Sequence, residues 1–435
     1  MPLSHARKIP VLQGRSPEPF VANIPGSKSM TNRGLLIAAM RMGKTEVAGA
    51  LDCEDSQALA SALDAFDGLS VAATPTGFRV ERSHERLTAP TTELDMGAAG
   101  TPARFLIGFA AAAAGTTVVT GTQRLCERPM DDLLSTLRQI GIRCDCLDKP
   151  GCLPVRVHGA RPTKSSWPIG AEVSSQFTSS LLLLASQQAG EPITLELQGN
   201  QASQPYVEMT RSMMAQCGIR TERPEADQIV VHPDAPGLDR IEVEADASSM
   251  SYFLGLAAIT ETTVVIPGIG TGTTQGDIRL TDALADMGCA VNLGNQSVEI
   301  TGRPLQGTDI DMGSMPDVAL TLAAVAAFAS TPTRIRNLAN LRVKESDRLR
   351  AAATELQRLG CQAEEGEDSL AIQPTGSWNP ALVRTYDDHR VAMAMSLPGL
   401  LQPGVAIDDP ACVAKSFPNY WQEFDRFYAH HEAYK

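Results

Sequence analysis

The stretch LRQIGIRCD (Leu137–Asp145) decides the fold, because a helical apolar pattern stops there at a glycine and a strand-like segment follows at once. The same junction occurs at five glycines, with successive ones 70 to 77 residues apart: Gly68, Gly141, Gly218, Gly288 and Gly360. This period is too long for a solenoid repeat and suits a supersecondary unit with two helices and several strands. Five complete units and a partial one would fill the chain, with three in each domain.

Start signals between these junctions predict further helices. The expected starts are Ser27–Ser29, Thr101-Pro102, Ser174–Gln176, Ser203–Pro205, Asp246–Ser249, Ser314–Asp317 and Asp387–His389. Several helices, such as the one containing FLIGFAAAAAG, are apolar almost all round, which predicts that they are buried. Runs such as TTVVTG, ITLEL and SVEITG are typical of strands. The sequence therefore predicts an α/β protein with repeated units and mixed sheets.

Length and composition exclude several classes of protein. With 435 residues the chain is too long for one core, so two domains are expected. A net charge of −13 argues against a nucleic-acid binder or a basic membrane-surface protein, although a small anion needs only a local basic pocket. There is no apolar run of transmembrane length and no signal-peptide core. We expect a cytoplasmic protein with no membrane or nucleic-acid partner.

The nine cysteines are odd in number and scattered, which predicts reduced thiols rather than a disulfide framework. Cys144, Cys146, Cys152 and His158 lie close in sequence, but their spacing matches no standard zinc pattern. We therefore expect no metal site.

The stretch NLRVKESDRLR (Asn340–Arg350) holds four cations and two carboxylates just where a helix is expected to begin. We expect Lys344 and Glu345 at the helix entry, where backbone N–H groups and the helix dipole favour an anion. A cation beside a carboxylate at such a site can hold a phosphate and move a proton. A solvated helix face is the alternative, and it would be preferred if the stretch stood alone.

Other expected helix starts repeat this design. They are PGSKSMTNR (Pro25–Arg33), GAAGTPAR (Gly97–Arg104), ERPM (Glu127–Met130) and DDHR (Asp387–Arg390), and AKS (Ala414–Ser416) adds another cation late in the chain. Each alone is compatible with an ordinary capped helix, and a lone His after two Asp is more often part of a cap than a base. If these helix starts converge, they would bind at least two anionic groups.

With these motifs in order, the chain resembles the 5-enolpyruvylshikimate-3-phosphate synthases, a family of enolpyruvyl transferases. The matching motifs are PGSKSMTNR, AGTPAR, ERPM, SSQF, SQPYVEMT, DASSMSYFL, MPDVALTLA, NLRVKESDRL, DDHRVAMA and AKSFPNYW. They span nearly the whole chain, and NLRVKESDRL and the SKS-x-x-NR signature are the most specific to the family.

The resemblance implies two similar domains, each with three βαβαββ-type repeats around buried helices and with the active site in the cleft between them. The expected domains are residues 25–245, and residues 1–24 together with 246–435. It also implies transfer of the enolpyruvyl group of phosphoenolpyruvate to shikimate 3-phosphate, with release of phosphate, in the shikimate pathway to aromatic amino acids. No cofactor is implied, and we expect a monomer.

The resemblance also assigns roles to individual residues. Asp317 is expected to act on the acceptor hydroxyl and Glu345 on the methylene carbon, with Lys28 as a third catalytic residue. The shikimate 3-phosphate site is expected to comprise Lys28, Ser29, Arg33, Ser174, Ser175, Gln176, Ser203, Tyr206, Asp317, Asn340 and Lys344. The phosphoenolpyruvate site is expected to comprise Lys28, Gly100, Arg128, Gln176, Arg348, His389, Arg390 and Lys415.

The chain departs from the common family pattern at Ala98, Pro102 and Phe105, which leaves sensitivity to the family's inhibitor glyphosate open. One alternative is a related transferase with another acceptor alcohol, although Gln123 and Cys126 do not match the loop cysteine of the UDP-N-acetylglucosamine enzymes. Others are a non-catalytic anion-binding paralogue and an RNA-end cyclase of related architecture. The net charge of −13 and the lack of an ATP-binding motif argue against the cyclase.

Overall fold

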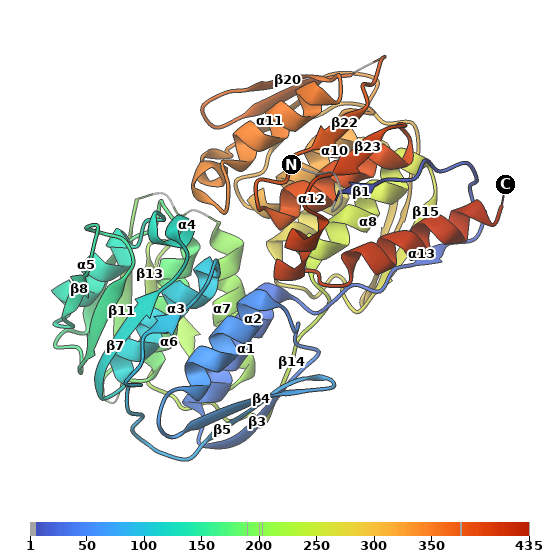
Figure 1. Cartoon of the computed structure of the whole chain (residues 1–435). Coiled ribbons are helices and arrows are strands. Elements are labelled where there is room, and N and C mark those ends of the chain that lie inside the picture. The colour runs from blue at the N-terminus through green and yellow to red at the C-terminus, as the bar shows by residue number, and fades with distance from the viewer. Residues whose placement is uncertain (1–5, 189, 200, 202, 375, 435) are drawn as a thin grey trace. The chain divides into compact units, whose positions relative to one another are not determined.

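A computed structural model describes residues 6–188, 190–199, 201, 203–374 and 376–434 (Figure 1). The chain divides into two compact units. The inserted unit is Gly26–Glu244, and the terminal unit joins Met1–Pro25 to Ala245–Lys435. Each unit has its own hydrophobic core, one built around Leu35, Phe105 and Leu182 and the other around Phe253, Leu322 and Met393.

The inserted unit contains three four-stranded sheets with the same topology. Their strand orders are β14-β3-β5-β4, β6-β7-β9-β8 and β10-β11-β13-β12. In each sheet the first pair is parallel and the other two pairs are antiparallel. The strands are β3 Gly43–Ala48, β4 Leu69–Thr74, β5 Gly77–Arg82, β6 Leu94–Asp95, β7 Gly115–Thr120, β8 Cys144–Cys146, β9 Val155–Gly159, β10 Ser166–Gly170, β11 Ile193–Gln198, β12 Thr221–Glu222, β13 Gln228–Val231 and β14 Arg240–Glu242.

Each of these sheets belongs to a repeat with two main helices. The helices are α1 Lys28–Met40, α2 Glu54–Asp64, α3 Gly100–Ala112, α4 Gln123–Cys126, α5 Asp131–Gln139, α6 Ser175–Ser186 and α7 Gln204–Gln216. The first helix of each repeat, α1, α3 or α6, is buried along nearly its whole length, as its apolar composition predicts. The polar residues of these helices lie mostly near their N-terminal ends.

The terminal unit repeats the plan twice in full and once in part. Its sheets have the orders β16-β17-β15-β2, β18-β19-β21-β20 and β1-β23-β22. The strands are β1 Arg7–Lys8, β2 Phe20–Val21, β15 Thr263–Pro267, β16 Ala290–Leu293, β17 Ser297–Thr301, β18 Asp309–Asp311, β19 Thr333–Arg336, β20 Gln362–Glu365, β21 Leu370–Gln373, β22 Ala381–Val383 and β23 Val405–Ile407. The helices are α8 Ala247–Thr260, α9 Leu280–Asp286, α10 Ala319–Ala326, α11 Arg348–Arg358, α12 His389–Ser396 and α13 Tyr420–Glu432.

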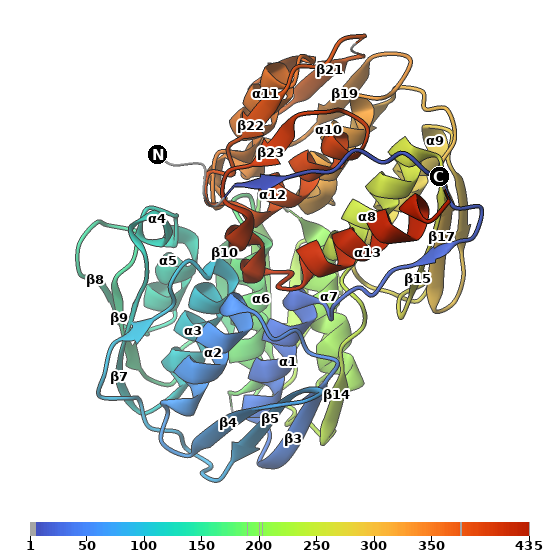
Figure 2. The same cartoon turned by 45° about the vertical axis from the view of Figure 1, so that its right-hand side comes forward.

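Segments from the beginning and from the end of the chain both belong to the terminal unit (Figure 2). Strand β1 pairs antiparallel with β23, and β2 pairs parallel with β15. Helix α13 packs on α8 through aromatic contacts, which include Tyr420 with Tyr252 and a network of Phe20 with Phe253 and Phe427. The N-terminal residues therefore complete two sheets of the unit that the C-terminal half builds.

The predicted α/β class with repeated units is confirmed, and five complete units plus a partial one are present. Three helix starts were placed wrongly. Helix α3 begins at Gly100 rather than after Thr101, and a 3₁₀ helix, η3 (Pro316–Val318), precedes α10. Helix α11 begins at Arg348, because Asp347 caps it by accepting from the Arg350 N–H.

Candidate functional site

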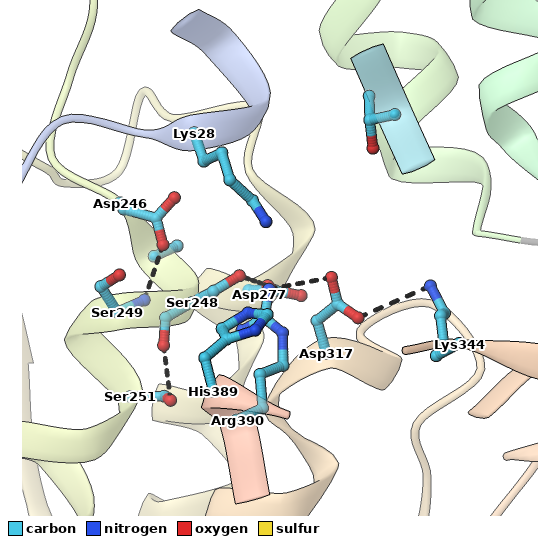
Figure 3. Close-up of polar contacts among 12 residues, drawn as sticks. Lys28, Asp246, Ser248, Ser249, Ser251, Asp277, Asp317, Lys344, His389 and Arg390 are labelled. Atoms are coloured by element: carbon cyan, nitrogen blue, oxygen red, sulfur yellow. Dashed lines mark hydrogen bonds and ion pairs between the residues drawn. The ribbon is translucent and has the colours of Figure 1, made fainter. Parts of the chain in front are cut away.

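In the terminal unit, Asp317 lies at the centre of a cluster of cations (Figure 3). It sits in η3, just before α10. Arg390 Nη2 is 3.0 Å from Asp317 Oδ2, and Arg348 Nη1 and Lys344 Nζ lie 3.1 Å and 3.6 Å from Oδ1. Burial acts to raise the pKa of Asp317, but Arg390, Lys344 and Arg348 outweigh it and hold the pKa far below its usual value. Asp317 is therefore ionised and is the shared counter-ion of three cations.

Arg348 joins the two carboxylates that were predicted to be catalytic. Its Nη2 is 2.8 Å from Glu345 Oε2, while its Nη1 contacts Asp317. The guanidinium is 2% exposed, and burial acts to lower its pKa. Asp388, Glu345 and Asp317 more than compensate, so the pKa of Arg348 is raised and the residue stays charged. One buried cation thus fixes the relative positions of Asp317 and Glu345.

Asp388 holds this cation in place, and the sequence prediction did not include it among the site residues. It accepts from Arg348 Nε at 2.8 Å and Nη2 at 3.2 Å, and from the Ser346 hydroxyl at 2.9 Å. It also caps α12 by accepting from the Arg390 N–H at 3.0 Å. Its only sequence signal was its position at a helix start, which predicts the cap but not the pairing with Arg348.

Lys344 and Glu345 were predicted to lie at a helix entry, but they lie in the turn that precedes the helix. Lys344 follows the 3₁₀ helix η4 (Ala339–Val343), and Glu345 lies two residues before the N-cap Asp347. Arg342 anchors the segment through Asp347 and Glu365 at 3.0 Å and 2.9 Å. Asp347 caps α11 by accepting from the Arg350 N–H, so its own carboxylate occupies the helix N-terminus where an anion was expected.

The remaining predicted residues of the terminal unit lie on neighbouring segments. Asn340 is in η4, and Lys415 is buried at the end of the 3₁₀ helix η6 (Pro410–Lys415). His389 is buried in the first turn of α12, with Nδ1 3.8 Å from Asp388 Oδ1. The structure therefore brings together Asp317, Lys344, Glu345, Arg348 and Arg390 through direct contacts.

In the inserted unit, Lys28 and Ser29 open helix α1. The N-cap is Ser27, whose hydroxyl accepts from the Met30 N–H. Lys28 Nζ forms an ion pair of 2.9 Å with Asp55 of α2. Asp55 is buried, and the sequence prediction did not single it out. The pair fixes the ammonium group at the start of α1, next to the hydroxyl of Ser29 in sequence.

Arg33, one turn further along α1, is 1% exposed and ties three helices together. Its Nε donates to Thr210 Oγ1 at 2.7 Å, and its Nη2 donates to Ser179 Oγ and to the Tyr206 carbonyl. The guanidinium also lies over the Phe105 ring, 5.1 Å from its centroid. Burial lowers the pKa of Arg33 to about 10. Its binding role stays a prediction, and its observed contacts are with neutral groups of the protein.

Gly100, the first residue of α3, allows Arg128 to approach closely. A Cβ atom at this position would lie 2.3 Å from Arg128 Nη1. Arg128 itself is buried. A larger residue here would therefore displace the Arg128 guanidinium, and the glycine is not explained by an unusual backbone angle.

Gln176 of α6 links the starts of α3 and α6. Its Oε1 accepts from Arg104 Nη1 at 2.5 Å, and its Nε2 donates to Thr101 Oγ1 at 2.7 Å. Arg104 also donates to the Pro129 carbonyl and lies over the Phe177 ring. Arg104 was quoted as part of a motif but not assigned to the site, so it is a positioning group that the prediction missed.

The predicted serines and Tyr206 lie at the starts of α6 and α7. Ser174 caps α6 by accepting from the Gln176 N–H at 3.3 Å, and Ser175 is buried in the first turn. Ser203 is the N-cap of α7 in a left-handed conformation with φ of 50°. Strained backbone of this kind is often found at binding sites. The carbonyl of Tyr206 holds Arg33, which connects α7 to α1.

The three departures from the family pattern lie near these groups. Phe105 is the ring beneath Arg33, Pro102 is buried in the first turn of α3, and Ala98 precedes the N-cap Ala99. They therefore affect the packing of α3 and Arg33 and replace none of the charged groups described above.

Two negative observations bear on the site. Among the described residues, no group of three or more His, Cys, Asp or Glu is placed to hold a metal ion. No helix in the described ranges is long and apolar enough to cross a membrane. All nine cysteines lie in the described part of the chain and have free thiols.

Two units of repeated βαβαββ topology, with cations and hydroxyls at helix starts and a cation-bridged carboxylate pair, define the class of enolpyruvyl transferases. The family model "EPSP synthase (3-phosphoshikimate 1-carboxyvinyltransferase)" matches residues 19–424. The chain belongs to this family. It is 40% identical to the 3-phosphoshikimate 1-carboxyvinyltransferase of Ralstonia pickettii over 418 residues, which cover 92% of this chain and 95% of that protein. The enzyme of Nitrosomonas europaea is also 40% identical, over 413 residues that cover 92% of this chain and 94% of that protein.

Solved structures show the same fold. EPSP synthase from Acinetobacter baumannii matches with a TM-score of 0.79 and 27% identity, over 97% of both chains. The enolpyruvyl transferase NikO from Streptomyces tendae matches with a TM-score of 0.74 over 97% of both chains, but at 18% identity. The second likeness shows the fold alone, so it does not favour another acceptor for this chain.

Proposed function

We propose that this chain transfers the enolpyruvyl group of phosphoenolpyruvate to the 5-hydroxyl of shikimate 3-phosphate and releases phosphate. The observation that carries this proposal is the Arg348 bridge, which holds Asp317 and Glu345 together among cations in a chain of this family. The reaction needs a group that protonates carbon, a group that accepts a hydroxyl proton, and cations for several anionic groups. The terminal unit supplies all three kinds of group.

The reaction proceeds by addition and then elimination. In the addition, Glu345 gives a proton to the methylene carbon of phosphoenolpyruvate, and the acceptor oxygen forms a bond to the adjacent carbon while Asp317 takes the hydroxyl proton. In the elimination, the carbon–oxygen bond to phosphate breaks, the Glu345 carboxylate takes a proton from the new methyl group to restore the double bond, and the leaving phosphate takes the proton held by Asp317. Atoms and charges balance without a cofactor or a metal.

The contacts of Asp317 explain how its basicity can depend on substrate. In the structure three cations lower its pKa, which makes it a weak base. A phosphate or carboxylate that binds Lys344, Arg348 or Arg390 supplies a second counter-ion, so the pKa of Asp317 rises. Binding of the anionic substrate thus activates the base, and the group is not active before the substrate arrives.

The remaining predicted residues fit the binding of the two substrates. Lys28, Ser29, Arg33, Ser174, Ser175, Gln176, Ser203, Tyr206, Asn340 and Lys344 are proposed for shikimate 3-phosphate. Lys28, Gly100, Arg128, Gln176, Arg348, His389, Arg390 and Lys415 are proposed for phosphoenolpyruvate. Arg33 and Arg348 are deeply buried, and each also holds neighbouring groups of the protein in position.

The test is phosphate release from the purified protein given both substrates, with mass spectrometry of the product. We expect phosphate in equal amount to a product heavier than shikimate 3-phosphate by one enolpyruvyl group. Release only with another phosphorylated or nucleotide-linked alcohol would contradict the proposed acceptor. Absence of release from folded protein with a panel of such alcohols would contradict transferase activity.

We also propose that the protein is a monomer in the cytoplasm. The nine free thiols are compatible with a reducing compartment. Size-exclusion chromatography with light scattering should give a mass near 46.3 kDa, and a mass of twice this value would contradict the monomer.

A further inference from the structure

Asp277 is a buried carboxyl group that the mechanism above does not use. It lies in the 3₁₀ helix η2 (Gly276–Arg279) and is 2% exposed. The Ser248 hydroxyl, in the first turn of α8, donates a short hydrogen bond to its Oδ2 (Figure 3). A buried carboxyl group that titrates beside a binding site can change the charge of that site.

The surrounding hydrogen bonds fix Asp277 relative to α8 and α10. The neighbouring Gln275 donates from Nε2 to the Ala245 carbonyl at 2.7 Å and accepts from the Ala247 N–H at 3.0 Å. This clamps η2 to the start of α8. Ser251 then donates to the Ser248 carbonyl at 2.6 Å and contacts Thr321 Oγ1 of α10 at 2.9 Å. The carboxyl group therefore has little freedom to move away from the charges near it.

The charged groups near Asp277 come from three elements. Asp317 comes from η3, Arg390 from α12 and Asp246 from the N-cap of α8. His389 adjoins Arg390 on α12 (Figure 3). The acidic residue Asp282 of the adjoining α9 is exposed.

These surroundings favour the protonated form of Asp277. Burial contributes most and raises its pKa to about 7, with Asp317 and Asp246 acting in the same direction. Arg390 and the Ser248 hydrogen bond oppose the rise. Asp277 and Asp317 are thus two carboxylates with opposite pKa shifts beside one guanidinium, Arg390.

Arg390 is the group through which Asp277 can affect substrate binding. Its Nη2 contacts Asp317 Oδ2 at 3.0 Å, and it lies near Tyr252, whose pKa burial raises to about 12. When Asp277 is protonated, Asp317 is the main counter-ion of Arg390 on this side. When Asp277 is ionised, a second carboxylate shares the guanidinium, and any incoming anion meets a less positive site.

We propose that Asp277 is a positioning residue that controls the affinity of Arg390 for an anionic substrate by taking up and releasing one proton. The identity of that anion, phosphoenolpyruvate, rests on the proposed function. The proton exchanges with solvent, and no covalent bond is made or broken. Protonated Asp277 gives the tight-binding state and ionised Asp277 the weak-binding state.

The experiment is the pH dependence of the KM for phosphoenolpyruvate between pH 5.5 and 9. For wild-type protein we expect KM to rise by roughly tenfold as pH increases through about 7, the effect of about one pKa unit of coupling. Asp277→Asn, which mimics the protonated form, should lose this rise. Ser248→Ala should move the rise to higher pH, because the lost hydrogen bond favoured ionised Asp277.

Two further variants separate Asp277 from other groups. Asp282→Asn removes an exposed carboxylate from neighbouring α9 and should keep the wild-type pH profile. Histidine generally titrates near neutral pH, so His389→Gln tests whether His389 causes the change of KM with pH, whatever its effect on the size of KM. The proposal is overturned if Asp277→Asn keeps the wild-type rise in KM, or if His389→Gln removes it while Asp277→Asn does not.

A second measurement does not need turnover. Because the folded-state pKa of Asp277 is raised above the value of an unfolded Asp, about 3.9, unfolding releases a proton between these two pH values. This group therefore makes the protein less stable as pH rises through the window. In wild-type protein, release of this one proton should raise the unfolding equilibrium constant by about tenfold for each pH unit in this window. Asp277→Asn should lack this increase. An unchanged slope would overturn the proposal.

Failure of the proposed function has a different signature. A wild-type protein that converts no phosphoenolpyruvate would contradict the proposed function, while the unfolding measurement would still report on Asp277. The charge at Arg390 would then be tested by stabilisation against heat with phosphoenolpyruvate as probe, at pH 6 and pH 8.5. Equal loss of stabilisation at the higher pH in wild type and Asp277→Asn would overturn the proposal.

Discussion

Arg33 and Arg348 are both buried arginines of candidate binding regions, one in each unit, yet their surroundings are opposite. Arg348 contacts three carboxylates, and these raise its pKa. Every hydrogen bond of Arg33 among the described residues goes to a neutral oxygen, and burial lowers its pKa to about 10. The terminal unit therefore neutralises its cation internally, while the inserted unit keeps a cation whose charge is not balanced by a bonded carboxylate.

The difference indicates a division of labour between the regions. A cation that holds carboxylates fixes their geometry and is suited to proton transfer. A cation held by neutral groups keeps a positive potential and is suited to an anion that has no reaction of its own. Under the proposed function, these would be the reacting phosphoenolpyruvate and the phosphate of the acceptor.

The largest expected effect is on catalysis in the terminal unit. Glu345→Gln keeps the size of the side chain but removes the acid, so we expect kcat to fall by about 10²- to 10⁴-fold. Binding of shikimate 3-phosphate, measured by calorimetry, should change little. Glu364→Gln, on exposed β20, is the matched control and should keep full activity. A kcat within a factor of three of wild type for Glu345→Gln would contradict the assigned acid.

A second prediction compares the two arginines directly through stability. Arg348→Met leaves buried Asp388 without its cation, so we expect a loss of about 3–5 kcal/mol in the free energy of unfolding. Arg33→Met leaves only neutral acceptors unpaired, so we expect a loss of about 1–2 kcal/mol. Both are measured by urea denaturation. Equal losses of unfolding free energy in the two variants would contradict the expectation that an arginine with charged partners contributes more to stability than one with neutral partners.

Sequence reasoning located the repeats and most helix caps because these depend on residues a few positions apart. The glycine junctions and the caps Ser27, Ser174 and Asp388 are of this kind. The resemblance to the family supplied residue roles that spacing alone could not. Neither predicted that Arg348 would pair with Asp388, since that contact joins residues 40 positions apart and depends on how α11 and α12 pack.

The misplaced start of α11 has a similar physical cause. NLRVKESDRL contains two acidic residues, and the prediction placed Lys344 and Glu345 at the helix entry. Asp347 is the actual cap, and it also pairs with Arg342, which in turn contacts Glu365 on β20. Glu365 lies outside a local sequence window around Asp347, so the sequence did not show which of these residues begins the helix.

A third prediction concerns acid stability and the charge cluster around Asp317. Its folded-state pKa is depressed, so its stabilising contribution is fully present above about pH 4, the pKa of an unfolded Asp, and is lost as pH falls below that value. Asp317→Asn should therefore be less stable than wild type by about 2 kcal/mol at pH 6. The difference should shrink as pH is lowered from 4 to 2. Asp286→Asn, an exposed residue of α9, serves as the control, and a pH-independent difference for Asp317→Asn would contradict the depressed pKa.

The smallest effect tests whether the inserted unit depends on shape as well as charge. In Gly100→Ala the new Cβ would lie 2.3 Å from Arg128 Nη1, so the guanidinium must shift. Alanine is a better helix former than glycine, so any harm arises from this contact and not from the backbone of α3. We expect the KM for phosphoenolpyruvate to rise by about tenfold, equivalent to about 1.4 kcal/mol, with little loss of stability. In Gly237→Ala, the nearest heavy atom to the new Cβ is 3.8 Å away, so this variant should behave as wild type. If Gly100→Ala and Gly237→Ala had the same KM for phosphoenolpyruvate, the position of the Arg128 guanidinium would not affect binding. Charge alone would then explain the contribution of the inserted unit to binding.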